Sequence, residues 1–346
     1  MNWFQATGIF IPMTVIWNYV RRRGPKKYSL INSPEARSLP ISFGFWDYFK
    51  AVVAWLFLFS RTFSVPPGLY YLGEKKNNSP ILVSGNFFLT LFLLAHSLRK
   101  SSVRLLVIDT EGINVWCSAG KGNFSADKII NMVKSYNLKE EESRLDVILP
   151  KFSLSGVKLA ELKKAGINPI IGPLYAEDVT RFLAEDRMKH CRADTVKLGV
   201  KHRFFTAVPT SIQFFYNYLG LYVVTLGWFP ASVIWIAAAL AFAYPILFPY
   251  LPGRQFAVKG SFFGVVVAVF MVTFLIFRSG VVVPIITWYA AFIIATAILI
   301  GLSYTGNSPV SNYTLVRKEI ARYLPIVIVL YGFSLLIYSL SYLGVI

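Results

Sequence analysis

The sequence predicts an α/β domain followed by a C-terminal all-α bundle of about five transmembrane helices. Three observations predict this fold class. Of the 346 residues, 55% are hydrophobic and the mean hydropathy is +0.54, which is too apolar for an ordinary soluble domain. From about residue 205 onward, the apolar residues form stretches of roughly 20 residues, the length of a membrane-crossing helix. Before that point, short apolar runs alternate with charged amphipathic stretches.

Residues 1–63 form an apolar or interfacial N-terminal segment with a basic cluster. Residues 3–20 are apolar but include polar side chains, and three arginines follow at 21–23. This order differs from a signal peptide, whose basic residues come first. It predicts either a marginal span or, as we favour, an interfacial helix held by the basic cluster. The shorter apolar run 51–59 predicts a buried or membrane-lying helix, because it is too short to span.

Residues 64–205 are predicted to form the α/β domain. Strands and helices alternate along this segment, which implies a mainly parallel sheet with helices packed on it. About 140 residues suffice to bury one hydrophobic core. The predicted strands are 80–84, 103–108, 147–149 and 169–171, and the predicted helices are 87–98, 125–137, 156–165 and 176–187.

Residues 206–346 are predicted to form the transmembrane domain. Arg254 and Lys259 lie at the loop 252–258, and Arg317, Lys318 and Arg322 lie in the loop 303–322. The positive-inside rule places both loops in the cytoplasm together with the α/β domain. The interiors of the predicted spans hold no charged residue, which disfavours ion or proton transport. The five predicted spans are 206–228, 231–251, 259–277, 281–302 and 323–344.

Charge and cysteine content narrow the class further. The net charge of +18 largely borders apolar stretches, where basic residues set topology and meet anionic lipid headgroups, so nucleic-acid binding is the weaker interpretation. The chain has two cysteines, Cys117 and Cys191. Two cysteines do not make a disulfide framework, and we expect thiols in a reducing compartment.

Cys117 is the candidate functional residue. It lies in the run DTEGINVWCSAGKG at 109–122, directly after the most apolar predicted strand. Ligands of open α/β sheets bind at the carboxyl ends of strands. Asn114 is a suitable N-cap, which makes Cys117 the third residue of a short helix, where a thiolate is favoured. The small residues Ser118, Ala119 and Gly120 would let a broad planar ligand approach.

Three chemistries could use such a thiolate. A nucleophilic enzyme needs a histidine base, and none of the chain's three histidines lies in a partner motif. A phosphate-binding loop needs glycine where Val115 stands and serine or threonine where Gly122 stands. A soft metal is the third chemistry, and one thiolate fills one coordination position, so the metal would arrive in a macrocycle such as a corrinoid. The alternative is that Cys117 is a buried small hydrophobe.

The run 109–122 resembles the cap-helix signature of the membrane-bound corrinoid proteins of microbial mercury methylation. That family is itself similar to the corrinoid iron–sulfur protein of the acetyl-CoA pathway. The resemblance covers roughly residues 43–325, and its C-terminal part favours the mercury branch because the acetyl-CoA pathway proteins lack a membrane bundle. Further segments that resemble the family are 67–70, 79–83, 172–173 with 176–178, 251–254, and 304–306 with 318–319.

The resemblance implies a Rossmann-like α/β corrinoid-binding domain. Its cofactor would be a cobalamin-type corrinoid whose cobalt takes the Cys117 thiolate as lower axial ligand, so that Cys117 is both the metal ligand and the catalytic residue. Asn114 and Trp116 would hold the cap helix under the corrin, and Ser118 stands where the family usually has alanine. The implied cofactor-binding residues are Asp109, Thr110, Asn114, Val115, Trp116, Cys117, Ser118, Ala119, Gly120 and Lys121.

The implied function is that of a corrinoid-dependent methyltransferase, a multi-pass methyl carrier in the cytoplasmic membrane that passes a methyl group to Hg(II) and forms methylmercury. Its implied partners are a ferredoxin-like protein with two 4Fe–4S clusters, a methyl-donor protein of the methyltetrahydrofolate pathway, and membrane lipids, with no nucleic acid. Two alternatives stay open. One is a corrinoid methyl carrier of the acetyl-CoA pathway or a paralogue with another acceptor, and the other is a cofactor-free membrane scaffold or transporter.

Overall fold

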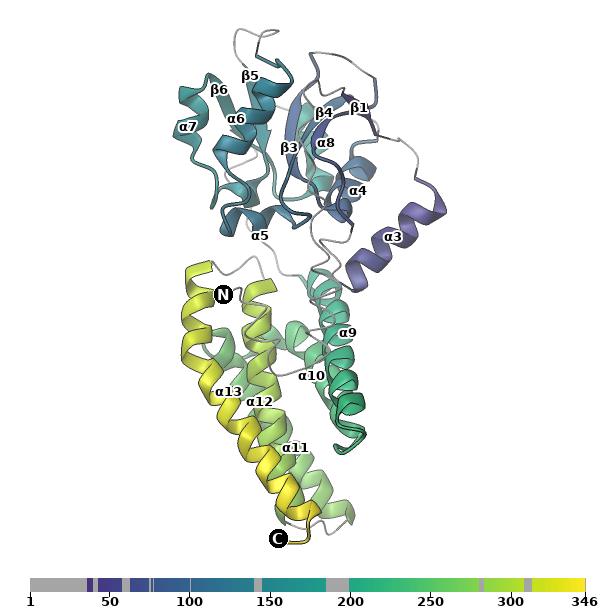
Figure 1. The fold of residues 1–346 in the computed structure, drawn as a ribbon, viewed down its shortest axis with the longest axis vertical. Helices are drawn as coiled ribbons and strands as arrows, with labels where there is room; N and C mark the ends of the chain where they lie inside the picture. Colours follow the sequence, from purple (N-terminus) through teal and green to yellow (C-terminus); the bar gives the residue numbers. More distant parts are fainter. Residues whose placement is uncertain are drawn as a thin grey trace. The chain divides into compact units, whose positions relative to one another are not determined.

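The computed structural model describes two compact units, an α/β unit within residues 36–184 and a helical unit within residues 199–345 (Figure 1). The predicted interfacial helix at 3–20 and the basic cluster at 21–23 lie outside the described residues. The structure describes residues 36–39, 43–57, 63–74, 76, 78–99, 101–139, 145–184, 199–279, 283–307 and 313–345.

The α/β unit is built on a six-stranded sheet with the strand order β1-β2-β4-β3-β5-β6. Strands β3 to β6 run parallel to one another, as the sequence predicts. Strand β2 pairs antiparallel with β4, and β1 pairs parallel with β2, so the sheet as a whole is mixed. The strands are β1 (Arg37–Ser38), β2 (Gly68–Leu72), β3 (Ile81–Gly85), β4 (Val103–Ile108), β5 (Leu145–Leu149) and β6 (Ile167–Ile171).

The four predicted strands are confirmed, whereas β1 and β2 were not predicted. The five residues of β2 are all buried, yet they follow two prolines and contain no strict apolar–polar alternation. Such a short run becomes a strand only where another strand offers its edge, and here β4 pairs with every residue of β2. The antiparallel edge of the sheet therefore depends on pairing distant in sequence.

Helices cover both faces of the sheet because side chains alternate along each strand. Ile81 and Val83 of β3 join the core beneath α6 (Ala126–Ser135) and α7 (Leu159–Lys164). Leu82 joins the core beneath α4 (Phe88–Ser97) and α8 (Val179–Ala184). Helix α3 (Phe45–Leu56) packs on α4, and a 3-10 turn, η2 (Ala176–Asp178), precedes α8. The predicted helices 87–98, 125–137 and 156–165 are thus confirmed, with shorter ends.

Helix α5 (Val115–Gly120) lies where the strand order reverses. Strand β3 has β4 on one side and β5 on the other, so the chain winds outward from β3 in both directions. Helix α5 contacts β3 and also η1 (Lys151–Ser153), the turn that follows β5 (Figure 1). Open α/β sheets bind ligands at such a switch point, outside the carboxyl ends of the strands. The fold therefore presents α5 where a ligand is expected.

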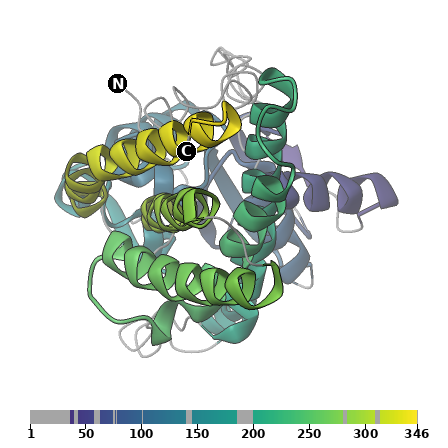
Figure 2. The same cartoon turned by 90° about the horizontal axis from the view of Figure 1, so that it is seen from below.

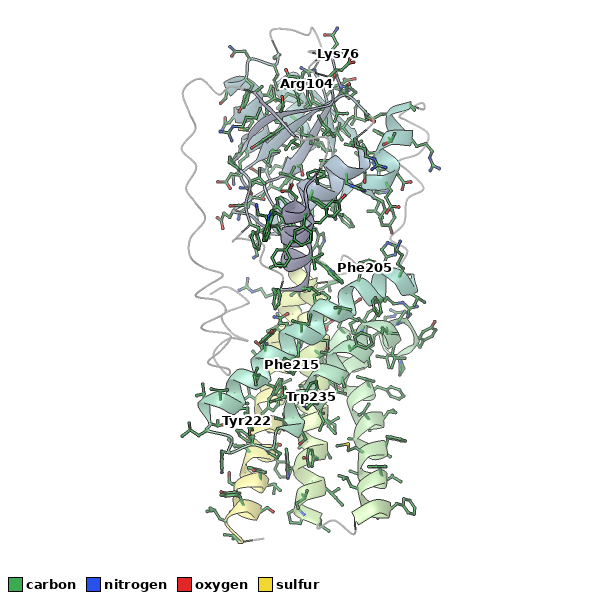
Figure 3. The ribbon with its side chains drawn as sticks, turned by 90° about the vertical axis from the view of Figure 1, so that its right-hand side faces the viewer. Lys76, Arg104, Phe205, Phe215, Tyr222 and Trp235 are labelled. Carbon is green, nitrogen blue, oxygen red and sulfur yellow. The ribbon has the colours of Figure 1, made fainter. Side chains whose placement is uncertain are left out.

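The helical unit contains five long helices. Helix α12 packs between α11 and α13, as the view in Figure 2 shows. Helix α9 packs on α10, where the rings of Phe215 and Trp235 lie 5.2 Å apart (Figure 3). The helices are α9 (Val200–Val224), α10 (Ser232–Leu247), α11 (Phe256–Ser279), α12 (Val283–Asn307) and α13 (Tyr313–Tyr342), and a 3-10 turn, η3 (Phe248–Tyr250), follows α10.

Four of these helices are long and apolar enough to cross a membrane, one fewer than the sequence predicts. The four segments are Ser232–Tyr250, Phe256–Phe277, Val283–Thr305 and Leu315–Tyr342. The predicted span 206–228 corresponds to α9, which is 25 residues long but less apolar, because Gln213 and Asn217 lie in its middle. The count of five was therefore right for helices and wrong for apolar spans.

The structure also corrects the expectation of charge-free interiors. Helices α11 and α13 begin before the predicted spans 259–277 and 323–344, and the predicted loop 303–322 is largely helical. Lys259 and Glu319 therefore lie within these helices, and both are buried. The Glu319 carboxylate accepts the backbone N–H groups of Phe256 and Ala257 at 3.2 and 3.1 Å. The Lys259 ammonium donates to the Phe248 carbonyl at 3.0 Å and to that of Leu251. Each charge is thus hydrogen-bonded to backbone groups at the end of a helix or turn, which stabilises it.

Glycines allow α11 and α12 to pack closely. A Cβ atom on Gly260 would lie 2.5 Å from the carbonyl oxygen of Ala297, and one on Gly264 would lie 2.9 Å from the Ala297 Cβ. Gly260 and Gly264 are four residues apart and share one face of α11, the spacing that brings helix backbones together in apolar surroundings.

We expect Gly260→Ala to destabilise the helical unit by about 1–3 kcal/mol, the usual cost of an overpacked contact. The matched control is Gly332→Ala on α13, where an added Cβ meets nothing within 4 Å. Removing that helical glycine should stabilise by about 0.5–1 kcal/mol. Unfolding of the purified full chain, followed by circular dichroism, measures both, and equal effects of the two substitutions would contradict close packing at Gly260.

Candidate functional site around Cys117

The loop from β4 to α5 is organised by the buried side chain of Asn86, which directly follows β3. The Asn86 Oδ1 accepts the N–H groups of Thr110 and Gly112 at 3.0 and 2.9 Å. The Asn86 Nδ2 donates to Asp109 Oδ1 at 3.1 Å. The side-chain amide of Asn86 therefore connects the end of β3 to Asp109, Thr110 and Gly112 of the loop.

The buried side chain of Thr110 makes further hydrogen bonds within the same loop. Its hydroxyl accepts the Asn86 N–H at 3.2 Å and lies 2.7 Å from the carbonyl oxygen of Ile113, to which it donates. Thr110 is fully buried, and a Cβ on Gly85 would lie only 2.8 Å from the Thr110 Oγ1. Glycine at position 85 is therefore needed for the loop to approach β3. The loop then turns through Glu111, which has a positive φ of 58°.

Asn114 is the N-cap of α5, as the sequence predicts. It has extended backbone angles, and its Oδ1 accepts the Cys117 N–H at 2.8 Å. Satisfying a donor in the first turn of a helix stabilises the helix start by about 1 kcal/mol. The same bond holds the backbone of Cys117, whose thiol is half-buried.

One side of α5 is packed into the α/β unit. Val115, Ser118 and Ala119 are buried, and the Ser118 hydroxyl donates to the Val115 carbonyl at 2.9 Å. A Cβ on Gly156 would lie 2.5 Å from the carbonyl oxygen of Ala119, so the segment after η1 contacts the helix backbone directly. The buried side of α5 thus fixes the height of the helix above the sheet.

The other side of α5 is open. Asn114, Gly120 and Lys121 are exposed, and Trp116 is half-buried like Cys117. A Cβ on Gly122 would meet no atom within 4 Å, which means open space after the helix. The predicted site residues therefore fall into two groups. Those that can face a ligand are Asn114, Trp116, Cys117, Gly120 and Lys121, whereas Thr110, Val115, Ser118 and Ala119 are buried and Asp109 is half-buried in the loop.

Basic side chains border this edge of the sheet. The Lys128 ammonium donates to the Asp109 carbonyl at 2.7 Å. Lys158, just before α7, donates to Glu161 Oε1 at 2.8 Å, and this hydrogen bond together with the charge of Glu161 raises the pKa of Lys158. Lys158 therefore keeps its positive charge at neutral pH.

The donor set around Cys117 bears on the metals that the site could hold. Among the described residues, no three His, Cys, Asp or Glu side chains come together as a metal site. His96 lies on α4, where its ring stacks on that of Phe92. A single thiolate supplies one coordination position, which suits a metal that brings its other ligands with it.

Asn86 is the residue that the sequence did not reveal. Its signal is an Asn directly after a strand that ends in glycine, a pattern too common to carry weight alone. Its importance follows from burial and from bonds to residues more than 20 positions away. Asp109 and Thr110, by contrast, were predicted as cofactor-binding residues, and the structure places them in the loop framework.

Comparisons with known proteins match the part of the chain that carries this site. The family described as CO dehydrogenase/acetyl-CoA synthase delta subunit matches residues 61–169. The acetyl-CoA decarbonylase/synthase complex subunit gamma of Methanopyrus kandleri is 29% identical over 124 residues, which are 35% of this chain and 27% of that protein. The subunit gamma 2 of Methanosarcina thermophila is 31% identical over 116 residues, 32% of this chain and 24% of that protein.

The name of a third relative mentions a corrinoid cofactor. The corrinoid/iron-sulfur protein large subunit of Moorella thermoacetica is 30% identical over 114 residues, 32% of this chain and 25% of that protein. The chain is thus related to the corrinoid proteins of the acetyl-CoA pathway. It spans about a quarter of the length of these relatives, and the helical unit lies beyond residues 61–169.

We expect Asn86→Ala to destabilise the α/β unit by about 1–3 kcal/mol, because Asp109, Thr110 and Gly112 lose partners in a buried loop. Hydrogen exchange of the 109–117 amides should become faster in this variant. The control is Asn131→Ala, an exposed asparagine on α6. Unchanged exchange in the loop of Asn86→Ala would contradict the role assigned to the amide.

Proposed function

We propose that the α/β unit is a corrinoid-binding methyl-carrier domain in which the Cys117 sulfur would bind the cobalt. The relation to a corrinoid/iron-sulfur protein supports the cofactor class. The observation that carries the assignment to Cys117 is its place on the open side of α5, at the switch point of the sheet.

The residues present fit such a group. A corrinoid brings its own ring of nitrogen ligands for cobalt, so the protein would add at most a single donor, and a thiolate is a soft donor suited to a transition metal. The space beyond Gly122 and the exposed Gly120 leave room for a broad ligand beside the sulfur. When bound, the corrinoid supplies a cobalt ion that can carry a methyl group and release it to an acceptor.

The chain's own residues position the donor. The Asn114 side chain holds the Cys117 backbone, and the buried Val115 and Ala119 keep α5 on the sheet. Trp116, half-buried beside Cys117, is proposed to contact the corrin ring. Lys121 is exposed at the end of the helix, where it can reach polar groups at the ring edge.

Two acceptors are proposed, and a different observation favours each. The names of the relatives favour methyl transfer within acetyl-CoA synthesis or breakdown. The helical unit favours Hg(II) as acceptor, because it lies beyond the matched residues 61–169 and because segments 251–254 and 304–306 resemble the membrane-bound mercury-methylating family. On this second proposal, the chain is a corrinoid-dependent methyltransferase that forms methylmercury.

The chain is also proposed to have partner proteins and a membrane location. The relatives are named as parts of a complex and as a corrinoid/iron-sulfur protein. These names support partners in a complex, such as an iron–sulfur subunit. The resemblance to the mercury-methylating family implies, and we propose, a ferredoxin-like partner with two 4Fe–4S clusters and a methyl-donor protein of the methyltetrahydrofolate pathway. Four apolar helices support an association with a membrane. We propose that this is the cytoplasmic membrane, with the α/β unit in the cytoplasm, on the basis of the positive-inside rule.

We expect the purified chain to carry a corrinoid that is visible in its absorption spectrum. Cys117→Ala should change that spectrum, because the sulfur ligand is lost. Cys191→Ala removes the other cysteine of the chain and should leave the spectrum unchanged. A wild-type protein that stays colourless after reconstitution with cobalamin would end the corrinoid proposal, and identical spectra of wild type and Cys117→Ala would end the assignment of the ligand.

The choice of acceptor has its own test. Cells that express the chain with a two-cluster ferredoxin are expected to convert Hg(II) to methylmercury, measured by mass spectrometry. Cells with Cys117→Ala should form none above background, whereas Cys191→Ala cells should retain the activity. If the wild-type cells form no methylmercury although the protein carries its corrinoid, Hg(II) is excluded and the acetyl-CoA acceptor is favoured.

A further inference from the structure

Helix α3 is attached to the α/β unit by its small residues. Ala51 and Ala54 are buried, and α3 packs on α4. At the border of this contact, the ring of Tyr48 lies 5.2 Å from that of Phe92 and 6.3 Å from that of His96. The buried part of α3 is thus formed by the small side chains of Ala51 and Ala54, and Tyr48 contacts α4 at its border.

The opposite face of α3 exposes large apolar side chains. Phe45 is 75% exposed and Trp46 is 68% exposed, and Phe49 and Val52 are also exposed. Phe45, Phe49 and Val52 are spaced as neighbours on one side of a helix. The three rings contact one another, with centroids 5.6 Å apart for Phe45 and Trp46 and 5.9 Å apart for Trp46 and Phe49. We call Phe45, Trp46, Phe49 and Val52 the aromatic face.

An exposed apolar cluster of this kind is costly in water and usually marks an interaction surface. Its composition points to a lipid partner. Aromatic side chains, tryptophan above all, are enriched at the boundary between membrane and water. The chain also has four helices apolar enough to cross a membrane, so a bilayer is available to α3.

Charge complementarity points to an anionic bilayer. In the sequence, residues 18–63 contain eight Lys or Arg and two Asp or Glu, and α3 itself carries one of each, Lys50 and Asp47. Lys50 is exposed beside the aromatic face. Basic residues next to an apolar helix face bind anionic headgroups, each contributing about 1 kcal/mol near the surface.

We propose that α3 lies in the headgroup layer of an anionic bilayer, with its aromatic face toward the acyl chains and Lys50 toward the headgroups. Figure 1 shows α3 at the side of the α/β unit. The side chains of the aromatic face are exposed. The contact would attach the α/β unit to the membrane surface independently of the helical unit. This inference does not rest on the corrinoid proposal.

The test uses the full chain in lipid nanodiscs, with a nitroxide label at position 49 or at position 50. Both cysteines are first replaced by serine, and then Phe49→Cys or Lys50→Cys introduces the label site. In nanodiscs with anionic phosphatidylglycerol, the label at 49 should collide with oxygen several-fold more, relative to a water-soluble nickel chelate, than the label at 50. Removing the anionic lipid should reduce that difference.

Two results would overturn the proposal. If the nickel chelate reaches both labels equally, the aromatic face lies in water. If the label at 49 is immobile and shielded from both oxygen and the chelate, a protein surface covers the face instead. Circular dichroism and gel filtration of each labelled variant check that the fold is retained, which is expected because positions 49 and 50 are exposed.

Discussion

The position of the Cys117 sulfur depends on the buried amide of Asn86. A buried amide is costly unless its donors and acceptors are satisfied, and a satisfied one is rigid. The Asn86 amide binds Asp109, Thr110 and Gly112, so the loop that leaves β4 is held to the end of β3. Because this loop leads directly into α5, the amide determines where the helix begins. The thiol follows at the third helical position, with its backbone held by Asn114.

Close backbone contacts add a second constraint on α5. Gly85 allows Thr110 to lie against β3, and Gly156 allows the segment after η1 to touch the backbone at Ala119. In each case a Cβ atom would lie closer than 3 Å to a neighbouring atom. These close contacts on the inner side of α5 therefore fix the distance between the helix and the sheet. The outer side of the helix, with Asn114, Gly120 and Lys121 exposed, is the side on which we propose that the corrinoid binds.

The helical unit contains buried charged side chains, among them Lys259 and Glu319. Backbone groups at the ends of α11 and η3 satisfy these two charges. Both charges therefore stabilise helix ends through hydrogen bonds to backbone groups. The family model matches residues 61–169, and the helical unit lies outside this matched region.

The sequence by itself determined the elements whose residues interact locally. The strands around 81–85 and 103–108 follow from continuous apolar runs, and the N-cap at Asn114 follows from a bond that spans three residues. Tertiary structure decided everything that needs a distant partner. Strand β2 exists because β4 pairs with it, and Asn86 matters because it meets a loop more than 20 residues away. The separation of α5 into a buried and an open side was likewise set by packing, since six residues of helix carry no periodicity long enough to reveal which side faces the sheet.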